Sequence, residues 1–162
     1  MRLLIIAILF LSVIGCSLIP PKTAEEAYKK TTFTVDEYSK TKLVEGPSVF
    51  MSISLGGAVT IFMRKVNESY QLHVTAHLDS WCFFNSAVDK NVGSLAYTKI
   101  RDLPRKGYSF HEEEFFLTIS ESQIVRMAEV GLDAKIYGRD CEAIVSLPPV
   151  YIQGFVKRAS EL

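Results

Sequence analysis

Apolar and polar residues alternate along much of the chain after residue 31, which is the pattern of strands that bury one face. The alternation is strongest in residues 49–55 and 59–63, on either side of Gly56-Gly57. A three-residue connection, Gly56 to Ala58, would place apolar residues opposite one another, whereas a two-residue turn would scramble the two faces. The resulting pairs are Leu55 with Val59, Ile53 with Ile61, and Met51 with Met63. The pattern therefore predicts a hairpin with this register.

The same alternation predicts further strands and the turns between them. Turns are expected at Asn67-Glu68-Ser69 and Gly138-Arg139-Asp140, and a loop is expected at residues 102–107, which contain Pro104. The expected strands cover residues 33–35, 72–78, 95–100, 115–119, 132–137 and 141–146.

Two segments have the spacing of a helix capping box, in which a hydroxyl and a carboxyl or amide group satisfy free backbone donors. Thr23 and Glu26 predict a short helix over Ala24 to Lys30. Ser120 and Gln123 predict a second helix of about ten residues.

A last helix is expected after Pro148-Pro149, although Gly154 weakens its pattern. Together these elements predict a single α+β domain over residues 23–162. Its core would be a mainly antiparallel sheet of five to eight strands with two C-terminal helices packed on it. A small β-sandwich in which the late helices are minor is the alternative fold.

The first sixteen residues have a different pattern. Arg2 is followed by an apolar run, Leu3 to Ile14, that a single serine interrupts, and then by Gly15 and Cys16. As a helix at 1.5 Å per residue this run would reach about 18 Å, which is short of the roughly 30 Å hydrocarbon core of a bilayer. The order of charge, apolar run and small residue predicts a secretory signal rather than a membrane-spanning helix.

The segment Val13-Ile14-Gly15-Cys16 resembles the lipobox of bacterial lipoproteins. The resemblance implies that residues 1–15 are a signal peptide, that lipid is attached to the sulfur of Cys16, and that cleavage makes this cysteine the first residue. Residues 16–22 would then be a short tether. Ser17, in place of the Asp linked with inner-membrane retention, implies the periplasmic face of the outer membrane. An uncleaved membrane helix and a plain secretory signal with a chance cysteine are the alternatives.

The composition describes a folded domain with balanced charge. The chain has 18 Lys and Arg residues against 18 Asp and Glu. Nucleic acid is not an expected partner, because its binding depends on clustered basic residues that neutralise phosphates. The densest apolar cluster after the signal is Trp81-Cys82-Phe83-Phe84, which is expected to lie in the core. An exposed aromatic patch for a partner is the alternative.

Cys82 and Cys141 are the other two cysteines of the chain. In an oxidising envelope compartment two remaining cysteines are more often paired than free, which predicts a disulfide. A bridge across about 60 residues would stabilise the fold by roughly 4 kcal/mol in the chain-entropy model. Two separate buried thiols are the alternative. A metal site is not expected, because there is no CxxC spacing and no nearby His.

Two polar clusters invite a metal or catalytic interpretation. His73 and His77 have i, i+4 spacing, but their alternating neighbours predict a strand, on which they would lie about 13 Å apart. They are expected to be solvent-facing or edge histidines and to bind no metal. Glu112, Glu113 and Glu114 are consecutive, and successive strand residues point to opposite faces, which predicts a solvated acidic edge.

No enzyme motif accompanies these clusters: the chain has no GxSxG, no HExxH, no phosphate-binding glycine loop and no dinucleotide fingerprint. We therefore do not expect an enzyme. Two constellations for an envelope hydrolase stay open: Cys82 or Cys141 with His73 or His111 as nucleophile and base, and Glu112 to Glu114 with Asp79 or Asp89 as an acid pair.

These expectations combine into an outer-membrane-anchored lipoprotein that acts as a non-catalytic structural or interaction module without a cofactor. Besides the membrane, its partner would be an envelope protein or the cell wall. A β-rich domain can accept such a partner by strand addition at an uncovered edge. A carrier of a small molecule or lipid, with a cavity in the sheet, is the alternative.

Overall fold

The computed structural model describes residues 19–53, 57–104 and 111–161. The strands are β1 (Thr32–Val35), β2 (Lys42–Glu45), β3 (Val49–Ile53), β4 (Gly57–Val66), β5 (Ser69–Leu78), β6 (Phe84–Asp89), β7 (Gly93–Pro104), β8 (His111–Ile119), β9 (Leu132–Gly138) and β10 (Glu142–Leu147). The helices are α1 (Ala24–Lys30), α2 (Glu121–Val130) and α3 (Pro149–Ser160). No helix among the described residues is long and apolar enough to cross a membrane.

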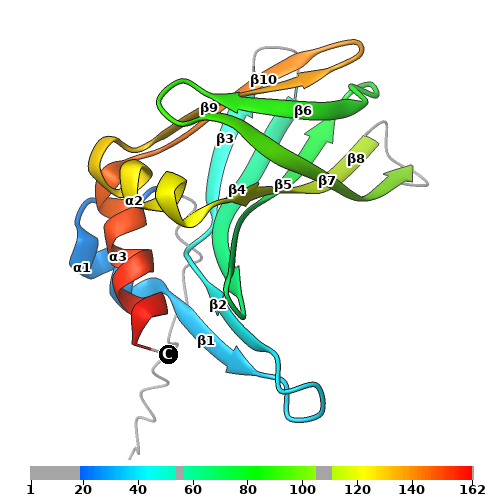
Figure 1. Cartoon of the computed structure of the whole chain (residues 1–162). Helices are drawn as coiled ribbons and strands as arrows, with labels where there is room; N and C mark the ends of the chain where they lie inside the picture. Colours follow the sequence, from blue (N-terminus) through cyan, green and yellow to red (C-terminus); the bar gives the residue numbers. More distant parts are fainter. Residues whose placement is uncertain (1–18, 54–56, 105–110, 162) are drawn as a thin grey trace, which may run out of the picture.

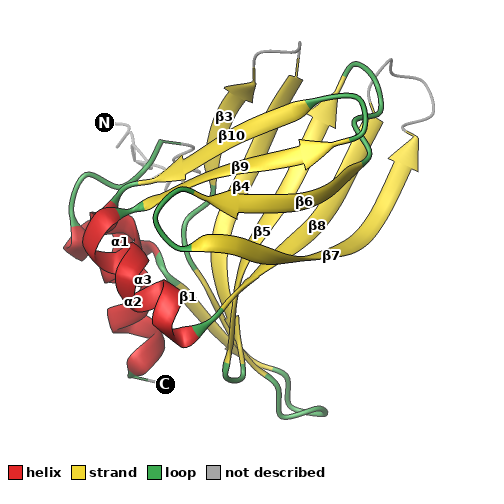
Figure 2. Cartoon of the chain, turned by 45° about the horizontal axis from the view of Figure 1, so that its top comes forward, coloured by secondary structure: helices red, strands yellow, loops and turns green. Residues whose placement is uncertain are grey.

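All ten strands belong to one antiparallel sheet, in the order β1-β2-β4-β5-β8-β7-β6-β9-β10, with β3 paired to β4 beside β2. The sheet curls into a half-barrel, and the three helices gather at one end of it (Figures 1 and 2). This end is called the helical end below, and the opposite end the distal end. The α+β prediction is confirmed at this level.

Two details of the fold prediction are wrong. The sheet has ten strands instead of five to eight, because β2 and β6 carry too little alternation to be recognised. Three helices pack at the helical end instead of two C-terminal ones. The additional helix is α1, which packs against α3.

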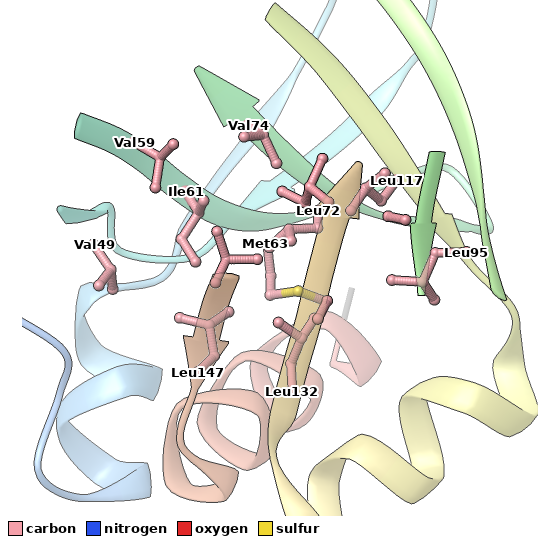
Figure 3. Packing of buried hydrophobic residues seen from close by; sticks show 14 of the residues in the cluster. Val49, Val59, Ile61, Met63, Leu72, Val74, Leu95, Leu117, Leu132 and Leu147 are labelled. Carbon is pink, nitrogen blue, oxygen red and sulfur yellow. The ribbon is translucent and has the colours of Figure 1, made fainter. Parts of the chain in front are cut away.

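The concave face of the sheet is filled by apolar side chains (Figure 3). At the helical end, Tyr151 of α3 closes this core. Its hydroxyl donates to the carbonyl of Pro47 (2.7 Å) and accepts from the N–H of Met63 (3.2 Å). Burial raises the pKa of Tyr151 above its ordinary value. Labelled in Figure 3 are the buried residues Val49, Val59, Ile61, Met63, Leu72, Val74, Leu95, Leu117, Leu132 and Leu147.

The β3–β4 hairpin turns earlier than predicted. Ile53 pairs with Gly57, and the other pairs shift with it: Met51 with Val59 and Val49 with Ile61. The predicted partner Leu55 lies outside the described residues. Gly57 belongs to β4 instead of the turn, and it approaches β5 so closely that a Cβ there would lie 2.7 Å from the carbonyl oxygen of His77. The shift is even, so the apolar residues still share one face.

Both predicted capping signals form helices with the expected bounds. The Ser120 hydroxyl accepts from the N–H of Gln123 (3.3 Å), whose side chain accepts from the N–H of Ser120 (2.9 Å). At α1, the Thr23 hydroxyl accepts from the N–H of Glu26 (3.1 Å). The Glu26 carboxylate instead accepts from the N–H of Lys22 (2.9 Å), so this box is closed one residue early.

Gly154, which weakens the helical pattern of α3, is the point where α1 packs closest. A Cβ at this position would lie 2.2 Å from the carbonyl oxygen of Ala24 and 2.5 Å from the Cβ of Ala27. The absence of a side chain therefore allows the two helices to touch, which explains a residue with poor helix propensity in a buried helix position.

Candidate functional site

His73 lies on the convex face of the sheet, on β5 as predicted, but it is buried. Its ring packs between Phe62 of β4 and Phe116 of β8, with centroid distances of 4.6 and 5.4 Å. Its Nε2 lies 2.7 Å from a carboxylate oxygen of Glu114. Only 8% of His73 is exposed, so the prediction of a solvent-facing histidine is wrong there. The aromatic neighbours on two other strands cover the ring.

His77 lies on the same face but contacts a different carboxylate. Its Nδ1 is 3.5 Å from an oxygen of Glu112. The strand prediction for both histidines is confirmed, and each is bound to its own glutamate on β8. Across the part of the chain that the structure describes, His, Cys, Asp and Glu residues form no cluster of three or more that could hold a metal ion.

The three consecutive glutamates do not form a solvated acidic edge. Strand β8 lies inside the sheet, between β5 and β7, and Glu112 and Glu113 are 8% and 2% exposed. Glu112 and Glu114 point to the convex face, where Arg101 of β7 forms ion pairs with both. The prediction was wrong because the position of a strand in its sheet is not encoded in its own alternation.

Burial and hydrogen bonding act in opposite directions on the pKa values of both His73 and Glu114. Burial lowers the pKa of His73 below its ordinary value, although the Glu114 carboxylate opposes that shift. Burial alone would raise the pKa of Glu114, but its hydrogen bonds with His73 and Arg101 lower it below its ordinary value. The Glu114 carboxylate therefore lies between two donors, His73 and Arg101, that favour its charged form.

Of the three remaining candidate acids, Asp79 is exposed after the end of β5, whereas Glu113 and Asp89 are buried and accept hydrogen bonds from backbone amides. Glu113 points to the concave side and accepts from three consecutive N–H groups, those of Cys82 (2.7 Å), Phe83 (2.9 Å) and Phe84 (2.9 Å). Asp89, which is 1% exposed, likewise accepts from the N–H groups of Asn91, Val92 and Asp133. Both carboxylates are thus engaged in holding the chain.

Cys82 and Cys141 form a disulfide, as predicted. It joins the segment before β6 to the β9–β10 turn, and the N–H of Asp140 donates to the carbonyl of Cys82 (3.2 Å) beside it. A sulfur in a disulfide is not a thiolate, so in this state neither cysteine can be the nucleophile of a Cys–His pair.

The aromatic segment around Cys82 is divided between core and surface. Cys82 and Phe84 are buried, whereas Trp81 and Phe83 are half-buried at the distal end. The Trp81 ring packs on His111 with a centroid distance of 4.5 Å, and the guanidinium of Arg139 lies 4.1 Å from the centre of the Phe83 ring. The core prediction therefore holds for half of the segment.

The half-barrel leaves an opening between β3 and β10, which we call the seam. The Cα atoms of these strands come within 8 Å of each other, yet β3 pairs only with β4 and β10 only with β9 in the described structure. Both views show the two strands side by side (Figures 1 and 2). A hollow of about 230 Å³ lies between them, lined by Ser52, Ile53, Glu142 and Ile144.

Alternate residues of β10 direct their backbone groups into the seam. The N–H of Gly138 donates to the carbonyl of Cys141 (2.8 Å), which makes these two a hydrogen-bonded pair of the β9–β10 ladder. Because bonded pairs alternate in an antiparallel ladder, every second residue after Cys141 also bonds to β9. The residues between them, Glu142, Ile144 and Ser146, therefore turn their N–H and C=O groups toward β3.

A third uncovered edge, on β7, is protected. β6 pairs with β7 only at residues 93–95, so the rest of β7 has one free side. That part carries Lys99, Arg101 and Asp102, and a register shift between Lys99 and Arg101 marks a bulge. Charged residues and bulges prevent unwanted strand pairing. The predicted loop at 102–107 is wrong for residues 102–104, which continue β7, and residues 105–107 lie outside the described residues.

The edges of β3 and β10 at the seam have neither a bulge nor the several charged residues that protect β7. β3 has no charged residue, and β10 has one, Glu142, with a ladder to β9 that runs without a shift from end to end. Beside the seam, Ile144 is 62% exposed and Phe50 is 44% exposed. The seam is the feature that sequence reasoning missed, because strand order decides which edges remain unpaired.

No family model, curated protein or solved structure matches this chain. Cys16 and the signal peptide predicted at residues 1–15 lie outside the described residues.

Proposed function

We propose that this protein is a non-catalytic interaction module of the bacterial envelope, anchored by lipid on Cys16 to the periplasmic face of the outer membrane. The observation that carries the proposal is the order of Arg2, the apolar run, Gly15 and Cys16. One acyl chain binds a membrane only marginally, whereas two give stable anchoring. The lipid chains that the lipobox resemblance implies would therefore hold the domain at the membrane.

Two features of the fold support this location. A disulfide is typical of proteins that fold in an oxidising compartment outside the cytoplasm, and Cys82 and Cys141 are bonded. Ala24, the first residue of α1, is eight residues after Cys16, so an extended tether would span at most about 28 Å. The helical end, where α1 packs on α3, would lie nearest the lipid, and the distal end would point away from it.

The polar clusters support a non-catalytic role. The sulfurs of Cys82 and Cys141 are in a disulfide. Glu113 and Asp89 each accept hydrogen bonds from three backbone N–H groups. The Glu114 carboxylate lies between the side chains of His73 and Arg101. Groups held in this way stabilise the fold and are poorly placed to transfer protons to a substrate.

The anchoring is tested by labelling cells with palmitate. Wild type should incorporate the label and fractionate with the outer membrane, whereas Cys16→Ser should remain an unlabelled precursor that keeps its signal peptide. Ser17→Asp is the matched control, because it should be labelled and processed but retained at the inner membrane. Normal labelling of Cys16→Ser would disprove the anchor. Hydrolysis of wall glycan by the purified protein, abolished in Glu114→Gln, would disprove the non-catalytic role.

A further inference from the structure

Three strands, β3, β7 and β10, have free edges long enough to pair with an added strand, and these edges differ in their protection against such pairing. The free side of β7 is protected by charge and by a bulge, whereas β3 and β10 have neither a bulge nor more than one charged residue between them. The unprotected edges face each other across the seam. The terminal strand β1 is only four residues long, and shortness is itself a protection against pairing.

We propose that the seam binds an extended segment of another envelope protein, which adds as a strand along β10. The proposal rests on the role proposed above and names the surface and the kind of partner. Strand addition uses backbone hydrogen bonds for affinity and side-chain pockets for specificity. Glu142, Ile144 and Ser146 offer the backbone groups, and the hollow beside Ile144 offers the pocket.

The side chains at the seam define the chemistry of the bound segment. Toward the core it would meet Ile53 and Val145, so every second residue should be apolar. Toward solvent it would meet Ile144 and Phe50, which are exposed apolar residues. The Glu142 carboxylate already forms an ion pair with Lys135 of β9 (2.6 Å), so it does not demand a basic residue from the segment. The expected segment therefore alternates between residues that face the core and residues that face Ile144 and Phe50.

The seam must widen for full insertion. A strand inserted between β3 and β10 and paired with both would need about 10 Å between them, which is twice the distance between paired strands. Their Cα atoms come within 8 Å at the closest approach, so β3 would move outward by a few ångströms or leave the new strand paired to β10 alone. No strand ladder resists this movement, because the described residues of β3 and β10 share none.

A second copy of this chain fits the seam less well. Two β10 strands paired antiparallel would place their helical ends at opposite ends of the pair, because β10 leads directly into α3. The two tethers, each at most about 28 Å long, would then leave in opposite directions. Both could reach one bilayer only if the strands lay flat on it. A segment of a different protein has no second tether that must reach the same bilayer. A dimer of this chain is therefore one of the outcomes that the test distinguishes.

The test is photo-crosslinking of the full-length lipoprotein in the cells in which it occurs naturally. Benzoylphenylalanine replaces Phe50 at the seam, and Val125 on α2 is the matched control site, because it is 59% exposed and distant from the seam. Mass spectrometry maps each adduct. Adducts from position 50 should fall on one alternating segment of another envelope protein, whereas position 125 should not label that segment.

A second variant shows whether the backbone of β10 makes the contact. Ile144→Pro removes an N–H that faces the seam and leaves the β9 ladder intact, since proline is tolerated on the free side of an edge strand. The yield of the position-50 adduct should fall at least tenfold. Ile144→Lys, which adds a charge at the edge, should do the same if the proline variant folds poorly. Val125→Lys should leave the yield unchanged.

Other results would overturn the proposal. Adducts to a second copy of the chain would make the seam a homodimer interface, and adducts to lipid alone, or none, would leave no strand partner there. An undiminished yield in folded Ile144→Pro or Ile144→Lys would exclude pairing through β10. If envelope proteins are labelled from position 125 and not from position 50, the interaction role survives and the seam is not its site. The anchoring role fails separately, in the Cys16→Ser experiment.

Discussion

Among the buried polar side chains, Glu113 should be the one whose replacement is most damaging. Its carboxylate accepts three N–H groups from Cys82, Phe83 and Phe84, and it is 2% exposed. Glu113→Ala would leave these donors buried without a partner. Each such donor costs about 1 to 3 kcal/mol. Allowing for partial rearrangement and entry of water, we expect a loss of about 3 to 6 kcal/mol in the free energy of unfolding.

Glu113→Gln keeps the shape of the side chain but removes its charge and replaces one acceptor oxygen by an NH₂ group. The amide oxygen can still accept from Cys82 and Phe83, whereas the NH₂ group would face the N–H of Phe84. We expect a smaller loss, of about 2 kcal/mol. Glu68→Gln is the matched control, because the Glu68 side chain is 96% exposed, and it should change stability by less than about 0.5 kcal/mol.

The assay is urea unfolding of the mature domain with its disulfide intact, followed by circular dichroism. A small domain has about 5 to 15 kcal/mol of stability in total, so Glu113→Ala should fold marginally or not at all. If Glu113→Ala and Glu68→Gln unfold at the same urea concentration, the three hydrogen bonds do not hold the loop as described.

Three further predictions concern the bridge, the buried histidine and the helix contact. Protein from the envelope should show no titratable thiol before reduction, and loss of Cys82 or Cys141 should cost about 2 to 5 kcal/mol; two thiols in denatured, unreduced protein would exclude the bridge. Because the pKa of His73 is lowered by folding, its neutral form stabilises the protein above about pH 6.5, and this contribution is lost as the pH falls through the folded pKa. Urea titrations should therefore show less destabilisation between pH 7 and 5 in His73→Gln than in wild type; equal pH profiles of these two proteins would contradict the burial of His73. Gly154→Ala should lower the thermal midpoint although alanine favours helices, since the new Cβ meets the backbone of α1; an unchanged or higher midpoint would show that the helices can separate at no cost.

Local and covalent features were predictable from the sequence. The Ser120 capping box involves residues three positions apart, and the spacing alone defines it. The pairing of Cys82 with Cys141 was predicted from the oxidising compartment that the signal pattern implies and from the absence of competing cysteines other than Cys16. Neither inference needs knowledge of strand order.

Features that depend on strand order could not be predicted. The alternation of β8 places Glu112 and Glu114 on one face and Glu113 on the other, but nothing in that segment says that β5 and β7 flank it. The segment that leads into β6 supplies the three amides that Glu113 meets, and β7 supplies Arg101, which pairs with the other two glutamates. The burial of His73 under rings from β4 and β8 has the same cause, and so does the seam, which exists only because β3 and β10 stay unpaired.

The anchored role is tested most directly by the intact mass of the protein purified from solubilised envelopes. We predict a mature chain that begins at Cys16, lacks residues 1–15, and carries the additional mass of its acyl chains on the first residue. Reduction with dithiothreitol should not remove that mass but should add two hydrogens at Cys82 and Cys141. A chain that retains Met1, or one that begins at Cys16 or later without lipid, would contradict the central claim.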